Sequence, residues 1–318
     1  MRWIVSRIRS DGGATAVMVA LLMVPLVGFA AIAVDAGALY AEKAQLQNGA
    51  DAAALAVAQH CAVDACGDTA STAEDFASAN ANDGAANVFN IELGSNTVTV
   101  SDSTRTAQGS GAMSHPLAAL IGVNSSTVHA TATAEWGGPG SGPAVLPIAL
   151  SYCEVINALE PGVAMTIRTD TNRPCHRAAG EPEIPGGFGW IDQIDGSCES
   201  YVDVTNGELW VGSDPGNNVP TLCKDKLDEL KGQTILIPVY DGARGNGQNA
   251  EYRIYAFAAF TITGWNFSGF SDTDPAASPS CTGNCRAIQG YFQKWVSVDS
   301  AFDLGGPDLG GSVVRLID

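Results

Sequence analysis

Eight cysteines are the side chains whose number and spacing most directly indicate a chemistry. All eight follow an apolar N-terminal segment, and an even number of cysteines in exported sequence is typical of disulfide bonds. The first two and the last two are close enough in sequence to close small loops, whereas the middle four allow three pairings. The sequence does not decide among those three. The eight residues are Cys61, Cys66, Cys153, Cys175, Cys198, Cys223, Cys281 and Cys285.

Metal binding is the alternative chemistry for the CTGNC stretch at 281–285. Structural zinc sites take four ligands from cysteine and histidine. No second cysteine pair or histidine lies near this stretch, and the whole chain has only 4 histidines. We therefore interpret the stretch as a disulfide loop, and the sequence predicts no metal-binding residues.

Familiar catalytic motifs are missing from the sequence, which contains no G-x-S-x-G elbow, no P-loop and no H-E-x-x-H. Gly245–Ala250 (GNGQNA) fits the spacing G-x-G-x-x-A, but a dinucleotide site needs a following helix to hold the pyrophosphate. A strand pattern follows here, so we interpret the stretch as a hairpin loop. The sequence predicts no catalytic residue, no cofactor and no small-molecule substrate.

Scattered acids and histidines are the remaining candidates. Asp241, Asp272 and Asp274 carry the oxygen ligands that Ca²⁺ prefers, but no EF-hand spacing surrounds them, so we interpret them as solvated turns. A catalytic triad would depend on folding that the sequence does not reveal. Three histidines lie in unrelated segments: His115, His129 and His176.

An uninterrupted apolar run, Ala14–Val34, is the element that positions everything after it. Its 21 uncharged residues would span about 31 Å as a helix, which matches the hydrocarbon core of a bilayer. Three arginines precede it, at 2, 7 and 9, so the positive-inside bias predicts a cytoplasmic N-terminus and an exported remainder. A cleaved signal peptide is the alternative, but its apolar region is shorter and helix-forming sequence continues here without a break.

A stripe of small apolar residues extends the predicted helix to about Gln59. The residues recur at spacings of seven, four, three and four, which places them on one helix face. Such a face packs closely, either on a partner helix or on the chain's own domain, and the sequence leaves both open. The stripe consists of Leu39, Leu46, Ala50, Ala53 and Val57.

The first exported region shows a short α/β pattern. A capping box at 71–74 predicts a helix to about Ala81, and a second, shorter helix is expected at 114–121. Alternation of apolar and polar residues at 127–136 predicts a half-buried strand, and another is expected at 97–101.

A Gly/Pro-rich stretch at 138–144 predicts a linker or a sharp bend, after which short apolar segments alternate with turn-rich ones. One helix is expected over about 220–231, closed by Gly232. The remaining apolar or alternating segments predict an antiparallel β domain, either a sandwich or an open barrel. They lie at 145–150, 165–169, 208–211, 234–240, 251–265, 291–298 and 312–317.

The predicted fold class is therefore α+β, with an N-terminal transmembrane helix that continues into a short α/β region and then a mostly antiparallel, disulfide-bonded β domain. The predicted divisions are a tail at 1–13, the transmembrane helix at 14–34, an exported region at 35–137, the linker at 138–144 and the β domain at 145–318.

The negative charge of the part predicted to be exported limits which kinds of molecule it can bind. The chain has 16 basic and 34 acidic side chains, and residues 11–318 keep 13 of the basic ones, for a net charge of −21. A body this acidic repels phosphate backbones, which excludes nucleic-acid binding. We interpret the acidity as a solubility feature of an exported domain.

The apolar run and the helix beyond it resemble a known family. The stretches RIRSDGGA at 7–14 and VDAGALYAEKAQLQNGADAAALAVA at 34–58 resemble the N-terminal segment of TadG-like proteins of the tight-adherence (Flp, type IVb) pilus assembly system. TVHATATAEWG at 127–137 resembles the end of that family's first exported region. The core of the match is Asp35, Gly37, Tyr40, Leu46, Gln47, Asn48, Ala50, Asp51, Ala52, Ala53, Ala54 and Leu55.

The resemblance implies a non-enzymatic, membrane-anchored accessory protein of Flp pilus assembly or a related surface-secretion system. Its expected partners are the bilayer and other pilus-assembly proteins, and its expected location is the cell membrane with the C-terminal domain outside the cytoplasm. Many TadG-like proteins have a von Willebrand A-type metal motif, Asp-x-Ser-x-Ser, which Asp102–Thr106 (DSTRT) does not match. Two other classes stay open: an anchored surface adhesin or binding module unrelated to pili, and an exported enzyme acting on cell-wall or glycan substrates.

Overall fold

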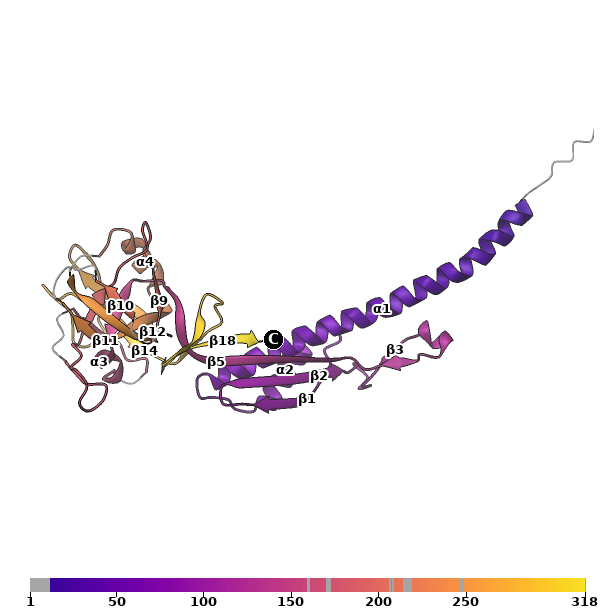
Figure 1. The fold of residues 1–318 in the computed structure, drawn as a ribbon, viewed down its shortest axis with the longest axis horizontal. Helices are drawn as coiled ribbons and strands as arrows, with labels where there is room; N and C mark the ends of the chain where they lie inside the picture. The colour runs from indigo at the N-terminus through magenta and orange to yellow at the C-terminus, as the bar shows by residue number, and fades with distance from the viewer. Residues whose placement is uncertain are drawn as a thin grey trace, which may run out of the picture. The chain divides into compact units, whose positions relative to one another are not determined.

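The computed structural model describes residues 12–158, 161–169, 173–205, 207, 209–213, 219–245 and 249–317 (Figure 1). The chain forms two compact units, which we describe one at a time. The first unit comprises Met1–Ala54, Thr69–Glu92 and Thr99–Ala132, and the second comprises Leu55–Asp68, Leu93–Val98 and Thr133–Asp318. Most of the predicted tail, at 1–11, lies outside the described residues.

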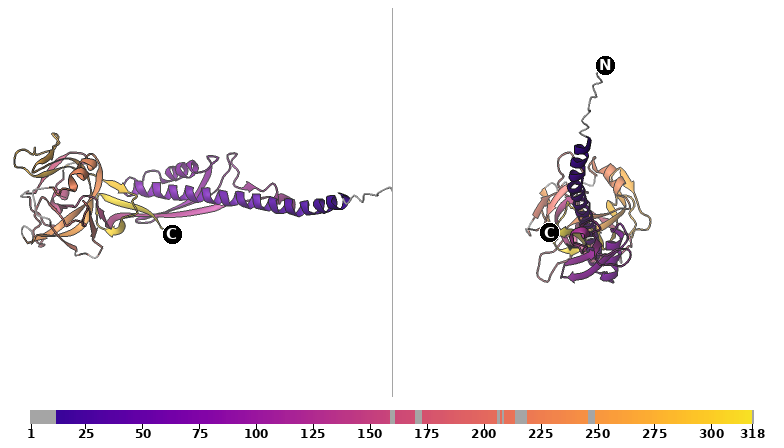
Figure 2. Two further views of the ribbon diagram at one scale, coloured as in Figure 1. Left: turned by 90° about the horizontal axis from the view of Figure 1, so that it is seen from above. Right: turned by 90° about the vertical axis from the view of Figure 1, so that its right-hand side faces the viewer.

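Helix α1, Gly12–Cys61, begins in the first unit and is unbroken despite Pro25 (Figure 2). Its sequence is rich in alanine and leucine, which have high helix propensity. The predicted continuation of the apolar helix beyond Val34 is confirmed. A shorter helix, α2 (Thr69–Ala79), follows it in the first unit and buries Ala73 and Ala77.

The sheet of the first unit has the strand order β1-β2-β5. β1 (Ala86–Leu93) was not predicted, whereas β2 (Thr97–Thr104) and β5 (His129–Ala144) were. Alternation along β5 buries Ala130 and Ala132 and exposes His129 and Thr131, as a half-buried strand requires. Three small elements complete this unit: β3 (Met113–Ser114), the 3₁₀ helix η1 (Ala118–Ile121) and β4 (Ser125–Ser126).

The second unit is built around one long hairpin of β11 (Thr234–Arg244) and β12 (Glu251–Phe267), which pair antiparallel. The larger sheet has the order β7-β14-β12-β11-β6-β8, with β10, β13 and β17 also pairing with β12. The C-terminal part of β5 pairs antiparallel with β9, β16 and β18.

The bounds of the other elements of this unit are β6 Ile148–Ser151, α3 Tyr152–Ile156, β7 Met165–Arg168, β8 Phe188–Trp190, β9 Ser200–Asp203, β10 Leu209–Gly212, α4 Cys223–Leu230, β13 Phe270–Asp272, β14 Ala287–Phe292, β15 Trp295–Ser297, β16 Asp303–Gly306, β17 Asp308–Leu309 and β18 Gly311–Ile317.

Both faces of the central hairpin are buried, which explains its nearly continuous apolar sequence. One face packs Phe260 and Trp265 into a core that includes α4, and the other packs Phe257 into a second core with Phe302. The predicted fold class is confirmed: the chain has a long N-terminal apolar helix followed by mostly antiparallel β-sheets with disulfides.

Four disulfides join the eight cysteines. Two close short local loops, Cys61–Cys66 and Cys281–Cys285. Of the three pairings that the sequence left open for the other four cysteines, the structure has Cys153–Cys175 and Cys198–Cys223. The last of these fixes the start of α4 to the core, because Cys198 and Cys223 are both buried there.

The Gly/Pro-rich stretch at 138–144 is extended strand in the structure, whereas the sequence predicted a linker. Gly138 pairs with Gly306 of β16, and Ser141 pairs with Asp203 of β9. A Cβ atom on Gly138 would lie 2.5 Å from the carbonyl oxygens of Gly306 and Pro307. The glycine therefore permits close approach of two backbones here. Division of the chain into domains at this stretch stays a prediction.

Candidate functional site

The apolar part of α1 is exposed on all sides. Within 15–34 every residue is exposed except Ala31, which is partly buried, and the side chains of Val24 and Phe29 are 75% and 72% exposed. Among the described residues, this is the one helix long and apolar enough to cross a membrane. A core helix of a soluble protein would be buried, and the most apolar window of α1 is 0% buried. The segment therefore presents an apolar surface that the described part of the chain does not cover.

Polar contacts hold α1 to the rest of the first unit directly after the apolar segment. The Asp35 carboxylate is buried and accepts a hydrogen bond from the backbone N–H of Ala118, at 2.5 Å. Further along the helix, Lys43 Nζ donates to the carbonyl of His129 at 2.6 Å, and Gln47 Nε2 donates to that of Thr131 at 3.1 Å. These contacts fix which side of α1 faces β5.

The predicted stripe on α1 is largely buried within the chain. Leu46, Ala50, Ala53 and Val57 are at most 4% exposed, and Leu39 is partly buried. Small residues allow close helix packing, and the burial corresponds to the alternative in which the stripe packs on the chain's own domain. Contact of this helix with a partner helix stays a prediction.

Asp102 on β2 is a buried acid at the same interface. Its side chain is 0% exposed, and neither carboxylate oxygen has a hydrogen-bond partner among the described side chains and backbone of other residues. A Cβ on Gly49 of α1 would lie 3.2 Å from Asp102 Oδ2 and 3.2 Å from the Ala77 carbonyl of α2, so glycine lets these elements meet.

Burial is the main cause of an unusual protonation equilibrium at Asp102. Removal of the carboxylate from water raises the pKa of Asp102 from 3.8 to about 7. The charge of Lys43 and the residue's own backbone N–H oppose the shift, whereas Glu42 and Asp51 add to it. In the sequence, Asp102 drew attention only as the first residue of a stretch that does not match a metal motif. The signal that could have found it is the period of two in β2, which places Asp102 on the buried face of Val98 and Val100.

The structure places the three predicted acidic candidates in different surroundings. Asp241 is buried and forms ion pairs with Arg177 at 2.8 Å and Arg253 at 2.7 Å. It lies in a bulge of β11, where the register with β12 shifts, and two guanidinium groups take the place a cation would occupy. Asp272 is paired with Lys231, and Asp274 Oδ1 accepts a hydrogen bond from the N–H of Ala276 at 2.8 Å. Among the described residues, no group of three His, Cys, Asp or Glu side chains has the arrangement of a metal site.

The three histidines each have a separate local partner. His115 is buried and its Nε2 lies 2.8 Å from the hydroxyl of Ser126. His129 packs edge-on against the ring of Phe89, and His176 Nδ1 lies 2.9 Å from the carbonyl of Glu181. The structure does not bring them into one catalytic arrangement.

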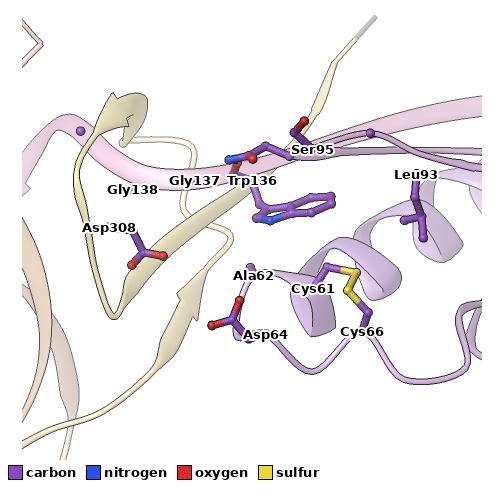
Figure 3. Close-up of a pocket in the computed structure, with 13 residues that line it drawn as sticks. Cys61, Ala62, Asp64, Cys66, Leu93, Ser95, Trp136, Gly137, Gly138 and Asp308 are labelled. Atoms are coloured by element: carbon purple, nitrogen blue, oxygen red, sulfur yellow. A yellow bond between two sulfur atoms is a disulfide. The ribbon is translucent and has the colours of Figure 1, made fainter.

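A cavity of about 700 Å³ in the second unit was not predicted from the sequence (Figure 3). Its walls are the C-terminal end of α1 with the Cys61–Cys66 disulfide, residues 93–96, residues 136–138 of β5, and Gly306 and Asp308. Two acids line it, Asp64 and Asp308, beside the indole of Trp136. These residues are far apart in sequence and belong to no motif, so only the folded chain brings them together.

The geometry of Asp64 follows from the way α1 ends. The Asp64 N–H donates to the carbonyl of Cys61, and the backbone of Asp64 adopts a left-handed conformation, with φ of 58°. This position after a helix is usually occupied by glycine, although aspartate tolerates it better than most residues. The conformation ends α1 and leaves the Asp64 carboxylate at the edge of the cavity.

Comparison with known proteins identifies one matching segment. Residues 12–60 match the family described as "Putative Flp pilus-assembly TadE/G-like". The match covers the apolar segment and the helix beyond it, which confirms the resemblance seen in the sequence. The chain matches no curated protein and no solved structure.

Proposed function

We propose that the protein is a membrane-anchored accessory component of Flp pilus assembly, without enzymatic activity of its own. The observation that carries the proposal is the exposed apolar segment at 15–34, which lies within the stretch of α1 that the pilus-assembly family matches at 12–60. Water disfavours an apolar surface of this length, and a bilayer accommodates it.

The proposed orientation places the N-terminus in the cytoplasm and the two folded units outside it. Arginines at 2, 7 and 9 precede the apolar segment, and all eight cysteines follow it. Disulfides persist in oxidising compartments, which agrees with four disulfides in the exported part. The buried contact of Asp35 with Ala118 favours retention of the helix over cleavage as a signal peptide, because it ties the end of the apolar segment to the folded chain.

The proposed partners are the bilayer and other pilus-assembly proteins. The exported region 35–137 would lie next to the membrane, and the β domain at 145–318 would serve as a binding or spacer module. A net charge of −21 for residues 11–318 argues against nucleic acid as a partner.

A second candidate function is that of an anchored binding module unconnected with pili. The cavity beside Trp136 favours this candidate, because concave sites with an aromatic side chain and a few polar groups commonly bind ligands. The two candidates differ in one respect that is easily measured, which is whether pili depend on the protein.

The test is deletion of the gene in the source bacterium, followed by complementation with the full chain, with residues 1–60 alone, or with a full chain carrying Leu22→Asp and Val24→Asp. We expect loss of surface pili on deletion, rescue by the full chain, and no rescue by the variant whose apolar segment is interrupted. Pili would be counted by electron microscopy, with immunoblots to check that each version accumulates.

Normal pilus numbers in the deletion strain would refute the assembly role and leave the binding-module candidate. Rescue by residues 1–60 alone would restrict the pilus function to the anchor helix. Full rescue by the variant with two aspartates in the apolar segment would refute the proposed anchoring.

A further inference from the structure

We propose that the cavity beside Trp136 binds the positively charged side chain of a lysine or arginine from a partner protein. The cavity lies wholly within the second unit and holds about 700 Å³, which exceeds the volume of one such side chain and leaves room for neighbouring backbone. The inference does not depend on the proposed role in pilus assembly.

The first argument is the sign of the charge in the cavity wall. Both ionisable residues that line it, Asp64 and Asp308, are acids. The C-terminal end of α1 also lines it, and the carbonyl groups at a helix C-terminus carry partial negative charge. No basic side chain lines the cavity among the described residues. The wall is therefore suited to a cation.

The second argument is a lysine of this chain that already forms an ion pair with Asp64 at the edge of the cavity. Lys294 Nζ lies 2.5 Å from Asp64 Oδ2. The Asp64 side chain is still 84% exposed, so its carboxylate has room for a second donor. Asp308 accepts one hydrogen bond from the N–H of Gly310 at 2.8 Å and is otherwise exposed. The Lys294 contact shows the kind of group that this edge accepts.

The third argument is an aromatic side chain on a fixed segment of backbone. Trp136 is partly buried, and its backbone exchanges two hydrogen bonds with Asn96, through its N–H at 3.0 Å and its carbonyl at 3.2 Å. It also pairs with Val314 of β18. The face of an indole attracts a cation electrostatically, and the paired backbone fixes the point from which this side chain extends. Figure 3 shows Trp136, Asp64 and Asp308 among the residues that line the cavity.

The charge of the whole chain indicates which partner would supply the cation. Residues 11–318 have a net charge of −21, so a second copy of this chain would be repelled. A basic protein segment would instead be steered toward the cavity, and the rate of this encounter would fall with ionic strength. The proposed occupant is therefore an exposed lysine or arginine of a different protein.

The test uses the full-length protein in a zwitterionic detergent and an acetylated, amidated tetralysine peptide as probe. The readout is the indole N–H signal of Trp136 in a ¹⁵N-labelled sample, assigned with Trp136→Phe. At an ionic strength of about 20 mM, where screening is weak, we expect tetralysine to shift this signal in a saturable way. A tetraglutamine peptide and a neutral chito-oligosaccharide should not shift it.

Three variants test whether the shift of the Trp136 indole signal depends on the carboxylates of Asp64 and Asp308. We expect Asp308→Asn to weaken tetralysine binding about threefold or more, and Lys294→Gln to tighten it by a similar factor because Asp64 is released. The asparagine oxygen can still accept the Gly310 hydrogen bond, so Asp308→Asn should fold. Asp228→Asn, at an exposed position on α4, is the matched control and should leave binding unchanged.

Two results would overturn the proposal. One is a Trp136 signal that tetralysine leaves unmoved in both the parent protein and Lys294→Gln. The other is a shift that the neutral oligosaccharide produces as strongly as tetralysine, which would identify the cavity as a carbohydrate site.

Discussion

Among single residues, Asp102 stands out because burying an unpaired carboxylate is costly. The interface of β2 with α1 and α2 excludes water from it, and Gly49 brings the helix against its oxygen atoms. No hydrogen bond from another described residue compensates. The residue therefore makes the stability of the first unit depend on pH.

The direction of this dependence follows from the raised pKa of Asp102. Well below pH 3.8 the carboxyl group is protonated in both the folded and the unfolded chain, so its burial does not make stability depend on pH. As the pH rises from 3.8 toward about 7, the unfolded chain loses its proton first, so the folded state is progressively destabilised. Above about pH 7 the loss is complete, and the shift corresponds to roughly 4 kcal/mol.

We predict that Asp102→Asn removes this loss. The variant should unfold at a higher temperature than the parent at pH 8, and the two should differ much less at pH 5. Thermal unfolding at both pH values is the measurement, with Asp75→Asn on the exposed side of α2 as control. An unchanged slope of stability against pH in Asp102→Asn would show that another group is responsible.

At the scale of elements, the packing of α1 depends on very small side chains. Gly49, Ala50 and Ala53 are buried where the helix meets the rest of the first unit. Interiors are close-packed, so added methyl groups force the neighbouring elements apart. Larger side chains are therefore tolerated on the exposed face of α1 but not on its buried face.

We predict that Ala53→Leu destabilises the protein by about 1–3 kcal/mol through overpacking. Ala44→Leu, on an exposed position of the same helix, should change the free energy of unfolding by less than about 0.5 kcal/mol. Denaturant titration followed by circular dichroism would measure both. Equal effects of the two variants would contradict the packing described here.

The disulfide at the start of α4 gives a second prediction at this scale. Cys198 and Cys223 are 25 residues apart, and closing such a loop is expected to stabilise the fold by about 3.5 kcal/mol in the chain-entropy view. Replacing both by alanine should lower the midpoint of denaturant unfolding by a corresponding amount. Replacing Cys281 and Cys285, which are 4 residues apart, should have a smaller effect. The reverse order would contradict the argument.

Periodicity explains which elements could be predicted from the sequence. α1 could be predicted from the apolar run and the stripe, and β5 from the alternation of apolar and polar residues. These patterns are reliable because they repeat over many residues. β1 was missed because its sequence, ANVFNIEL, has a weak pattern and half-exposed residues. The stretch 138–144 was interpreted as a linker because glycine and proline usually interrupt structure, whereas here the glycines allow backbones to approach.

The candidate sites were harder to predict than the elements. Asp64, Trp136 and Asp308 meet only through tertiary folding, and no local pattern connects them. The same applies to Asp241, whose two arginine partners come from a distant loop and the neighbouring strand. Disulfide pairing also depended on the fold, since three pairings of the four central cysteines were equally compatible with the sequence.

For the whole molecule, the exposed apolar segment and the acidic remainder of the chain have opposite solvent preferences. The former is stable in hydrocarbon, and the latter, with a net charge of −21 for residues 11–318, is stable in water. The proposed anchoring, with the apolar segment in the bilayer and the acidic units in water, would satisfy both preferences.

We predict that two charges in the apolar segment release the protein from membranes. Leu22→Asp with Val24→Asp should cost roughly 5–7 kcal/mol of insertion free energy, so the protein should leave the membrane fraction on alkaline extraction. Phe89→Asp with Val298→Asp, at two exposed apolar positions outside α1, should leave it membrane-bound. A membrane-bound Leu22→Asp, Val24→Asp protein would show that the segment is not the anchor.

The continuity of α1 has a mechanical consequence. The helix passes from the exposed apolar segment to the buried residues near Gly49 without a loop, a break or a change of element. An α-helix is stiff, and each residue advances it by about 1.5 Å and 100°. A rotation of the apolar segment, or its displacement along the helix axis, would therefore be passed along α1 to the packed end of the helix in the first unit.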